Sequence, residues 1–174
     1  MKSRISGKKA AYLGLLCAAA MILGYVESLI PVFAGVPGMK LGLPNAAIVM
    51  VLYLYTWKEA LLVSAVRILG IGFLFGNPFS IAFSSAGAAV SLLCMQLAKK
   101  SGRFDTVGVS IIGGVMHNAG QIVVAMCIVE NVRVGYYFFV LAISGVITGM
   151  IIGIISGELT KRMRRAITRS GGTL

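Results

Sequence analysis

Arg67 is the residue in this sequence whose chemistry is most conspicuous, because it stands midway along an apolar run. A charged side chain at the centre of a membrane helix costs about 2.5 to 3.5 kcal/mol, so Arg67 is expected to face a protein interior or a watery cavity. Its planar guanidinium could hold a carboxylate or phosphate group of a ligand. The alternative is a structural ion pair with Glu27, which lies about one turn from the end of the first apolar run.

His117 and Gln121 form a second polar pair within an apolar run. Residues four apart share one face of a helix, and the positions around this pair are glycines and Asn118. This pattern indicates a lining surface at about the same membrane depth as Arg67. The alternative is that His117 is hydrogen-bonded to a neighbouring helix. A proton relay is disfavoured, because Glu27 is the only carboxylate embedded in an apolar run.

Lys40, Asn45 and Asn77 lie beside prolines and glycines at the ends of apolar runs. Turn formation or helix capping is one explanation for such asparagines. The other is that these side chains rim a pocket that opens from the outer face toward the membrane midplane. We therefore predict a substrate-binding site formed by Glu27, Lys40, Asn45, Arg67, Asn77, His117 and Gln121.

Membrane helices are the elements expected to position these residues. Of the 174 residues, 58% are hydrophobic, and the mean hydropathy of +0.93 is too high for a protein surface that faces water. Because a spanning helix needs about 20 apolar residues, the chain has room for six slightly short helices and no soluble domain. We expect an all-α integral membrane fold, a bundle of six transmembrane helices near 10–30, 45–57, 60–75, 79–98, 107–129 and 135–156. The whole chain, 1–174, then forms one transmembrane domain with short basic tails at about 1–9 and 158–174.

The distribution of basic residues predicts the orientation of this bundle. Lysine and arginine are enriched in cytoplasmic loops of membrane proteins. With the N-terminus inside, thirteen basic residues lie on the cytoplasmic side, and only Lys40 and Arg133 lie outside. The N- and C-termini are therefore both expected in the cytoplasm. The net charge of +11 reflects this topology rather than nucleic-acid binding.

Several kinds of site are not indicated by the sequence. Cys17, Cys94 and Cys127 are scattered singly in apolar runs, without the spacing of a metal site. No phosphate-binding loop of the form GxxxxGK[ST] occurs, so the chain is not expected to hydrolyse ATP itself. We predict no cofactor and no metal.

Small residues recur every four positions on two of the predicted helices. Gly145, Gly149, Gly153 and Gly157 form such a series on the last helix, and two shorter series occur on the first. Small residues let helix backbones approach closely within a membrane. We expect these series to pack inside the protein, with docking to another membrane protein as the alternative.

Four segments resemble a known family: Gly24-Tyr-Val-Glu27-Ser-Leu-Ile-Pro31, Pro37-Gly-Met-Lys40-Leu-Gly-Leu-Pro44-Asn45, Gly76-Asn77-Pro78 and His117-Asn118-x-x-Gln121. The family is heptaprenyl diphosphate synthase component I, also called the Gx transporter family, and the resemblance covers nearly the whole chain. More distantly, the six short helices are similar to the substrate-binding S components of energy-coupling factor transporters. Both resemblances imply a bacterial cell membrane.

The synthase name can be compared with the residues present. Prenyl diphosphate synthases hold Mg²⁺ through paired aspartate-rich motifs, whereas this chain has one aspartate and four scattered glutamates. The chain is therefore expected to be noncatalytic. The name then implies an accessory membrane subunit that works with a soluble prenyl synthase in making the menaquinone side chain.

The S-component likeness implies a different function, namely capture of a small, anionic or vitamin-like solute from the outer face. Such a subunit would need a transmembrane coupling subunit with ATPases, and by analogy Ala10, Gly14 and Ala18 of the first helix would contact it. We place this solute-binding or transport hypothesis first and the accessory subunit second. A membrane enzyme that uses His117 is the least favoured hypothesis, since no second acid or base is evident nearby.

Overall fold

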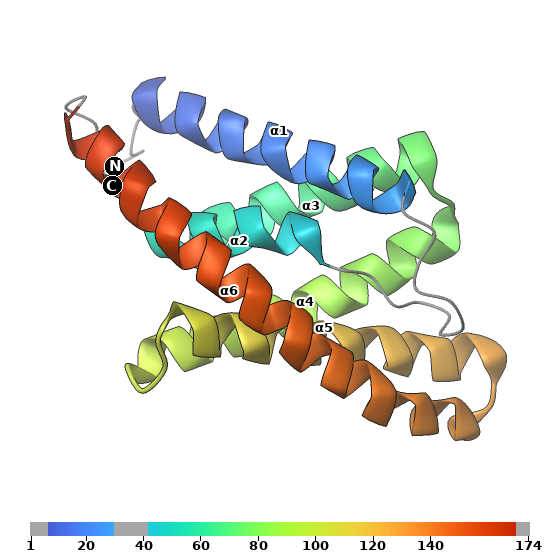
Figure 1. Ribbon diagram of the computed structural model, residues 1–174. Helices are drawn as coiled ribbons and strands as arrows, with labels where there is room; N and C mark the ends of the chain where they lie inside the picture. The colour runs from blue at the N-terminus through green and yellow to red at the C-terminus, as the bar shows by residue number, and fades with distance from the viewer. Residues whose placement is uncertain (1–6, 30–41, 170–174) are drawn as a thin grey trace, which may run out of the picture.

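The computed structural model describes residues 7–29 and 42–169, and the regular structure in these ranges is entirely helical (Figure 1). The α-helices are α1 (Gly7–Leu29), α2 (Leu43–Leu54), α3 (Trp57–Phe75), α4 (Pro78–Ser101), α5 (Thr106–Val129) and α6 (Phe138–Arg169). A short 3-10 helix, η1 (Val132–Tyr137), leads into α6. The predicted all-α architecture with six helices is confirmed for the described residues.

Long apolar helices and exposed apolar side chains give the protein its membrane character. Among the described residues, four helical segments are long and apolar enough to cross a bilayer: α1, α4, α5 and the continuous segment η1–α6. Large side chains such as Phe73, Leu93 and Ile154 are more than half exposed on the helix surfaces. Such surfaces would be unfavourable in water, but they match the hydrocarbon of a bilayer.

Helix α2 is short and lies in the middle of the bundle. Its 12 residues span about 18 Å, less than the roughly 30 Å of a bilayer core. Most of its residues are buried, and it packs against α1, α3 and α6. Gly42 precedes it with φ of 72°, a left-handed conformation that favours glycine. The Pro- and Gly-rich segment 31–44, whose apolar composition predicts that it folds back over the outer mouth of the bundle, lies largely outside the described residues.

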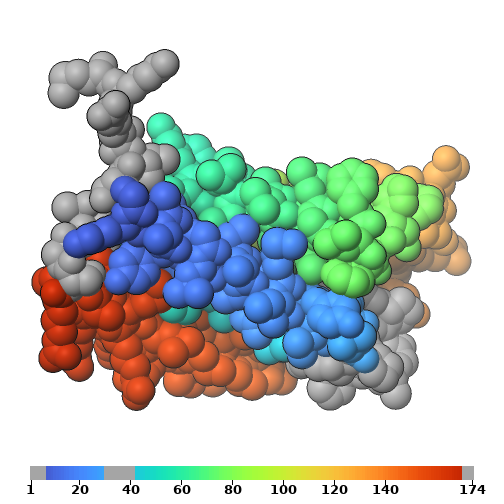
Figure 2. Space-filling view, turned by 90° about the horizontal axis from the view of Figure 1, so that it is seen from above, coloured from blue at the N-terminus to red at the C-terminus, as the bar shows by residue number. Residues whose placement is uncertain are grey.

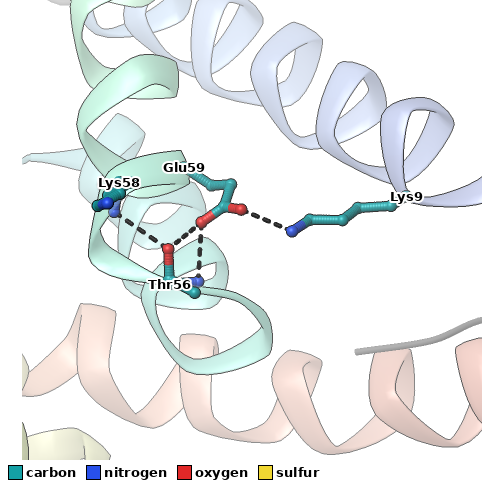
Figure 3. A network of polar contacts seen from close by, with 4 residues as sticks. All are labelled: Lys9, Thr56, Lys58 and Glu59. Carbon is teal, nitrogen blue, oxygen red and sulfur yellow. Dashed lines mark hydrogen bonds and ion pairs between the residues drawn. The ribbon is translucent and has the colours of Figure 1, made fainter. Parts of the chain in front are cut away.

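Helix α3 begins at Trp57, three residues earlier than predicted. Thr56 and Glu59 form a capping box, in which the Thr56 side chain accepts from the backbone N–H of Lys58 at 3.3 Å and Glu59 accepts from the N–H of Thr56 at 3.2 Å. The Glu59 carboxylate also accepts from the Thr56 hydroxyl and from the Lys9 ammonium of α1, the latter at 2.6 Å (Figure 3). The network fixes the start of α3 against the start of α1.

Helix α6 runs to Arg169, so the prediction that it ends near residue 156 and is followed by a tail was wrong. The added segment is amphipathic. Thr160 and Ile167 are buried against the bundle, whereas Glu158 and Arg162 form an exposed ion pair at 2.9 Å. Lysine and arginine are good helix formers, so the basic composition does not end the helix.

The end of the bundle that holds the basic residues is closed by bonds to the last turn of α2. Lys99 of α4 donates to the carbonyl of Leu52 at 2.6 Å, and Arg164 of α6 donates to the carbonyl of Tyr53 at 3.0 Å. Cations are favourable at a helix C-terminus, where carbonyl groups lack partners within the helix. The start of α1 and the end of α6 lie at this same end (Figure 1).

The glycine series of α6 packs against α5, which confirms the packing prediction for this helix. A Cβ atom at Gly149 would lie 2.7 Å from Cα of Ile111, and one at Gly153 would lie 2.7 Å from Cα of Val107. Helices α5 and α6 therefore touch backbone to backbone. On α1 the packing prediction holds for one of the two series only. Gly24 is packed against Ile71, whereas a Cβ atom at Gly14 would meet no atom of the described residues within 4 Å.

The six α-helices form a closed ring of contacts in which α2 lies between α1 and α6. Helix α1 packs on α2 and α3, α3 on α4, α4 on α5, α5 on α6, and α6 again on α2. Figure 2 shows α1 lying along one face of the molecule, with α3 and α4 on one side and α6 on the other. Side chains from every helix can therefore point toward one interior.

Candidate functional site

A cavity of about 240 Å³ lies inside this ring, and we refer to it as the central cavity. All six α-helices contribute to its wall. Its polar lining consists of Glu27, Ser28, Asn45, Arg67, Ser80, Ser84, His117, Asn118 and Thr148. The remaining lining residues are mainly glycines and apolar side chains of α3. Residues from distant parts of the sequence thus converge on one polar space.

Arg67 reaches the central cavity from the middle of α3, about 15 Å along the helix. Its Nε and Nη2 atoms are buried, and neither has a hydrogen-bond partner in the part of the chain that the structure describes. Within that same part, no salt bridge joins Arg67 to a carboxylate. Buried donors without partners are unfavourable by about 1 to 3 kcal/mol each, so an anionic group here would gain charge-assisted hydrogen bonds.

Glu27 binds the start of α2, and the alternative of a salt bridge with Arg67 is not seen among the described residues. Its carboxylate is buried and accepts hydrogen bonds from the backbone N–H groups of Gly42 and Leu43, the second at 3.3 Å. These N–H groups lack partners within their helix, and the positive end of the helix dipole favours a carboxylate. Glu27 therefore bonds to α2 and also lines the cavity, where its negative charge acts on Arg67 without a salt bridge between the two in the described part of the chain.

His117 and Asn118 bring α5 to the central cavity. The His117 ring lies directly against α4, since a Cβ atom at Gly87 would lie 2.9 Å from its Cε1 and Nδ1 atoms. Asn118 donates from Nδ2 to the carbonyl of Leu141 in α6 at 2.7 Å. Both side chains line the central cavity.

A second, larger cavity of about 530 Å³ adjoins the central cavity, and we refer to it as the apolar cavity. It lies among α4, α5, η1 and α6, and Ser80 lines both cavities. Its lining consists of Asn77, Phe79, Ser80, Phe83, Gln121, Ile122, Ala125, Val129, Val134, Tyr137 and Leu141. The lining of the central cavity is thus richer in polar side chains, and the lining of the apolar cavity is mainly apolar.

The structure divides the predicted site between these cavities. The central cavity is lined by Glu27, Asn45, Arg67 and His117. Gln121 and Asn77 line the apolar cavity instead. Asn77 also caps α4, because its Oδ1 accepts from the N–H of Ser80 at 2.8 Å, as the capping alternative expects. Lys40 lies outside the described residues.

Four hydroxyl side chains of the central cavity were absent from the predicted set: Ser28, Ser80, Ser84 and Thr148. Hydroxyl residues give a weak signal within apolar helices, because they readily bond to their own backbone. Thr148 does so, donating to the carbonyl of Ser144 at 3.0 Å. A small-residue face on α4 that includes Ser84 was the available clue.

The predicted docking residues of α1 lie on its outer surface. Ala10, Gly14 and Ala18 are exposed, and a Cβ atom at Gly14 would meet no atom of the described residues within 4 Å. This stripe is therefore unused by the bundle itself. Contact with a partner subunit stays a prediction.

The fold and the cavities define an α-helical membrane protein with an enclosed polar site. The model of the heptaprenyl diphosphate synthase component I family matches residues 16–159, which cover most of the chain. The chain belongs to this family. Comparisons with curated proteins and with solved structures gave no match.

Proposed function

We propose that this protein is a noncatalytic membrane subunit that binds a small anionic solute in the central cavity. The observation that carries this proposal is Arg67, with two buried guanidinium nitrogens that have no hydrogen-bond partner in the described part of the chain. A carboxylate or phosphate matches the planar donor fork of arginine. Asn45 and His117 supply further polar groups around it.

The solute would enter from the outer face of a bacterial cell membrane. The end with Lys99 and Arg164 is the basic end, and the positive-inside rule assigns it to the cytoplasm together with both termini. Glu27, near the C-terminus of α1, and Asn45, near the N-terminus of α2, line the central cavity at the end of the bundle away from the basic residues. Six crossings, with α2 as a short buried one, complete this topology.

Transport would require partners. The exposed stripe of Ala10, Gly14 and Ala18 offers close backbone approach to a transmembrane coupling subunit that works with ATPases. Without such partners, binding alone would not move a solute against a gradient.

The second candidate is an accessory subunit for the synthesis of heptaprenyl diphosphate. The family to which the chain belongs favours it, because its name designates one component of a synthase. In this role the protein would copurify with a soluble prenyl synthase and would have no effect on solute uptake.

Native mass spectrometry of the protein purified from its own host tests both candidates. The solute-binding proposal predicts a retained anionic compound that is lost in Arg67→Met and kept in Arg133→Met, a matched substitution of an exposed arginine in η1. Copurifying ATPases would support transport, whereas a prenyl synthase without a bound solute would support the accessory role. If Arg67→Met fails to fold, Arg67→Lys is the variant to compare, since it keeps the charge but loses the planar fork.

A further inference from the structure

The two cavities are complementary in chemistry and meet at one residue. The central cavity holds the buried Arg67 guanidinium, whereas most side chains that line the apolar cavity are aromatic or aliphatic. Ser80 belongs to both walls. A ligand that fills both spaces would therefore need a polar end and an apolar end.

The sizes of the cavities favour joint occupancy. Pockets for small organic ligands usually measure about 300 to 1,000 Å³. The central cavity, at about 240 Å³, lies below this range and suits a head group. Joined to the apolar cavity of about 530 Å³, it falls within the range.

The apolar cavity also borders the surface that faces lipid. Phe79, Val129 and Tyr137 line this cavity and are each more than half exposed. They come from α4, α5 and η1, so the boundary lies between helices. A ligand with an apolar chain could reach the site from the bilayer, without passing through water.

We infer that the ligand is an amphiphile, with an anionic head group at Arg67 and a single apolar chain in the apolar cavity. This inference rests on the proposed function, because it assigns the ligand class of the same Arg67 site. The polar residues of the apolar cavity are Asn77, which caps α4, with Ser80, Gln121 and Tyr137, and its other seven lining side chains are apolar and suit an alkyl or isoprenoid chain. The ligand would lie across Ser80, where the two walls meet.

Photoaffinity labelling of the full chain in phosphatidylcholine nanodiscs tests the inference. The probe is decyl phosphate with a diazirine at the far end of its chain, and the matched neutral probe is the corresponding alcohol. Peptide mapping should place the phosphate label on apolar-cavity residues of α4 and α5, such as Phe83 and Val129. Excess unlabelled decyl phosphate should suppress this label, and decanol should not.

Two substitutions separate the head-group site from the chain site. Arg67→Gln should reduce cavity labelling about tenfold or more, the effect of losing charge-assisted hydrogen bonds. Ala125→Phe should fill the apolar cavity and abolish the label there, while Ala89→Phe on an exposed face of α4 should leave it unchanged.

The possible failures are distinguishable. Equal labelling by the phosphate and the alcohol, insensitive to Arg67→Gln, would mean that only a lipid tail occupies the apolar cavity, which overturns the inference. A second failure would combine two results: ethyl phosphate suppresses labelling in a way that depends on Arg67, and the decyl label lies outside the apolar cavity. This outcome would keep the proposed anion site and reject the amphiphile. Absence of any Arg67-dependent binding would reject the proposed function itself. The competition experiment needs no variant, so it holds even if Arg67→Gln fails to fold.

Discussion

Replacing Gly149 with leucine should separate α5 from α6 and destabilise the bundle. A Cβ atom at Gly149 would lie 2.7 Å from Cα of Ile111, whereas ordinary contacts begin at 3.4 Å, so the helices must move apart by about 0.7 Å. Overpacking of this kind costs about 1 to 3 kcal/mol, and leucine recovers about 0.8 kcal/mol through its higher helix propensity. Because backbone atoms cannot turn aside, we expect the upper end of that range, a net loss of about 2 kcal/mol.

Thermal unfolding of the full-length protein in detergent measures this effect, with the surviving monodisperse fraction followed by size-exclusion chromatography. For a chain of this size, about 2 kcal/mol lowers the midpoint by roughly 4 to 8 °C. Gly14→Leu is the control, because a Cβ atom there meets nothing within 4 Å. If the midpoint of Gly149→Leu matched that of Gly14→Leu, close packing of the α6 glycines could not be what holds these helices together.

Two further predictions concern the ends of the bundle. Thr56→Ala removes the capping box of α3 and should lower the free energy of unfolding by about 1 kcal/mol, measured as above, whereas Lys58→Ala, which keeps the Thr56 and Glu59 side chains, should have little effect. In a variant without native cysteines, a cysteine at Asn131 should react with an impermeant maleimide on intact cells, and one at Ser101 should react only after permeabilisation. The reverse labelling pattern would invert the proposed orientation.

The helices of this protein were predictable because each apolar run is interrupted by turn-forming or charged residues. Gly76 and Asn77 separate α3 from α4, and the basic residues after Ala98 mark the start of the next turn. The end of α6 was missed because a run of basic residues indicates a solvated tail when only charge is considered. Its buried Ile167 belongs to an amphipathic pattern that a helical reading of the same segment would have detected.

Which residues line the central cavity was only partly predictable from the sequence, because the spacing of residues along one helix does not show which other helices pack against it. His117 and Gln121 share a face of α5, yet they line different cavities. Between them, Asn118 is bonded to the backbone of α6 at Leu141, which lines the apolar cavity. The partition depends on contacts between helices, and a single sequence does not specify those contacts.

The position of Glu27 determines how the Arg67 site should be understood. If the two side chains formed a salt bridge, Arg67 would be satisfied and the cavity would have no preference for an anion. Glu27 instead binds the N–H groups at the start of α2, and its bond to Gly42 fixes the residue that leads into that helix. Arg67 therefore retains hydrogen-bond donors for another partner. A ligand with an anionic group that accepts these bonds would stabilise the folded protein by about 2.7 kcal/mol at a concentration a hundred times its Kd. That stabilisation by the ligand should be lost when Arg67 is replaced, because the guanidinium is the group that the ligand needs. It should persist when Glu27 is replaced, provided that α2 stays in place.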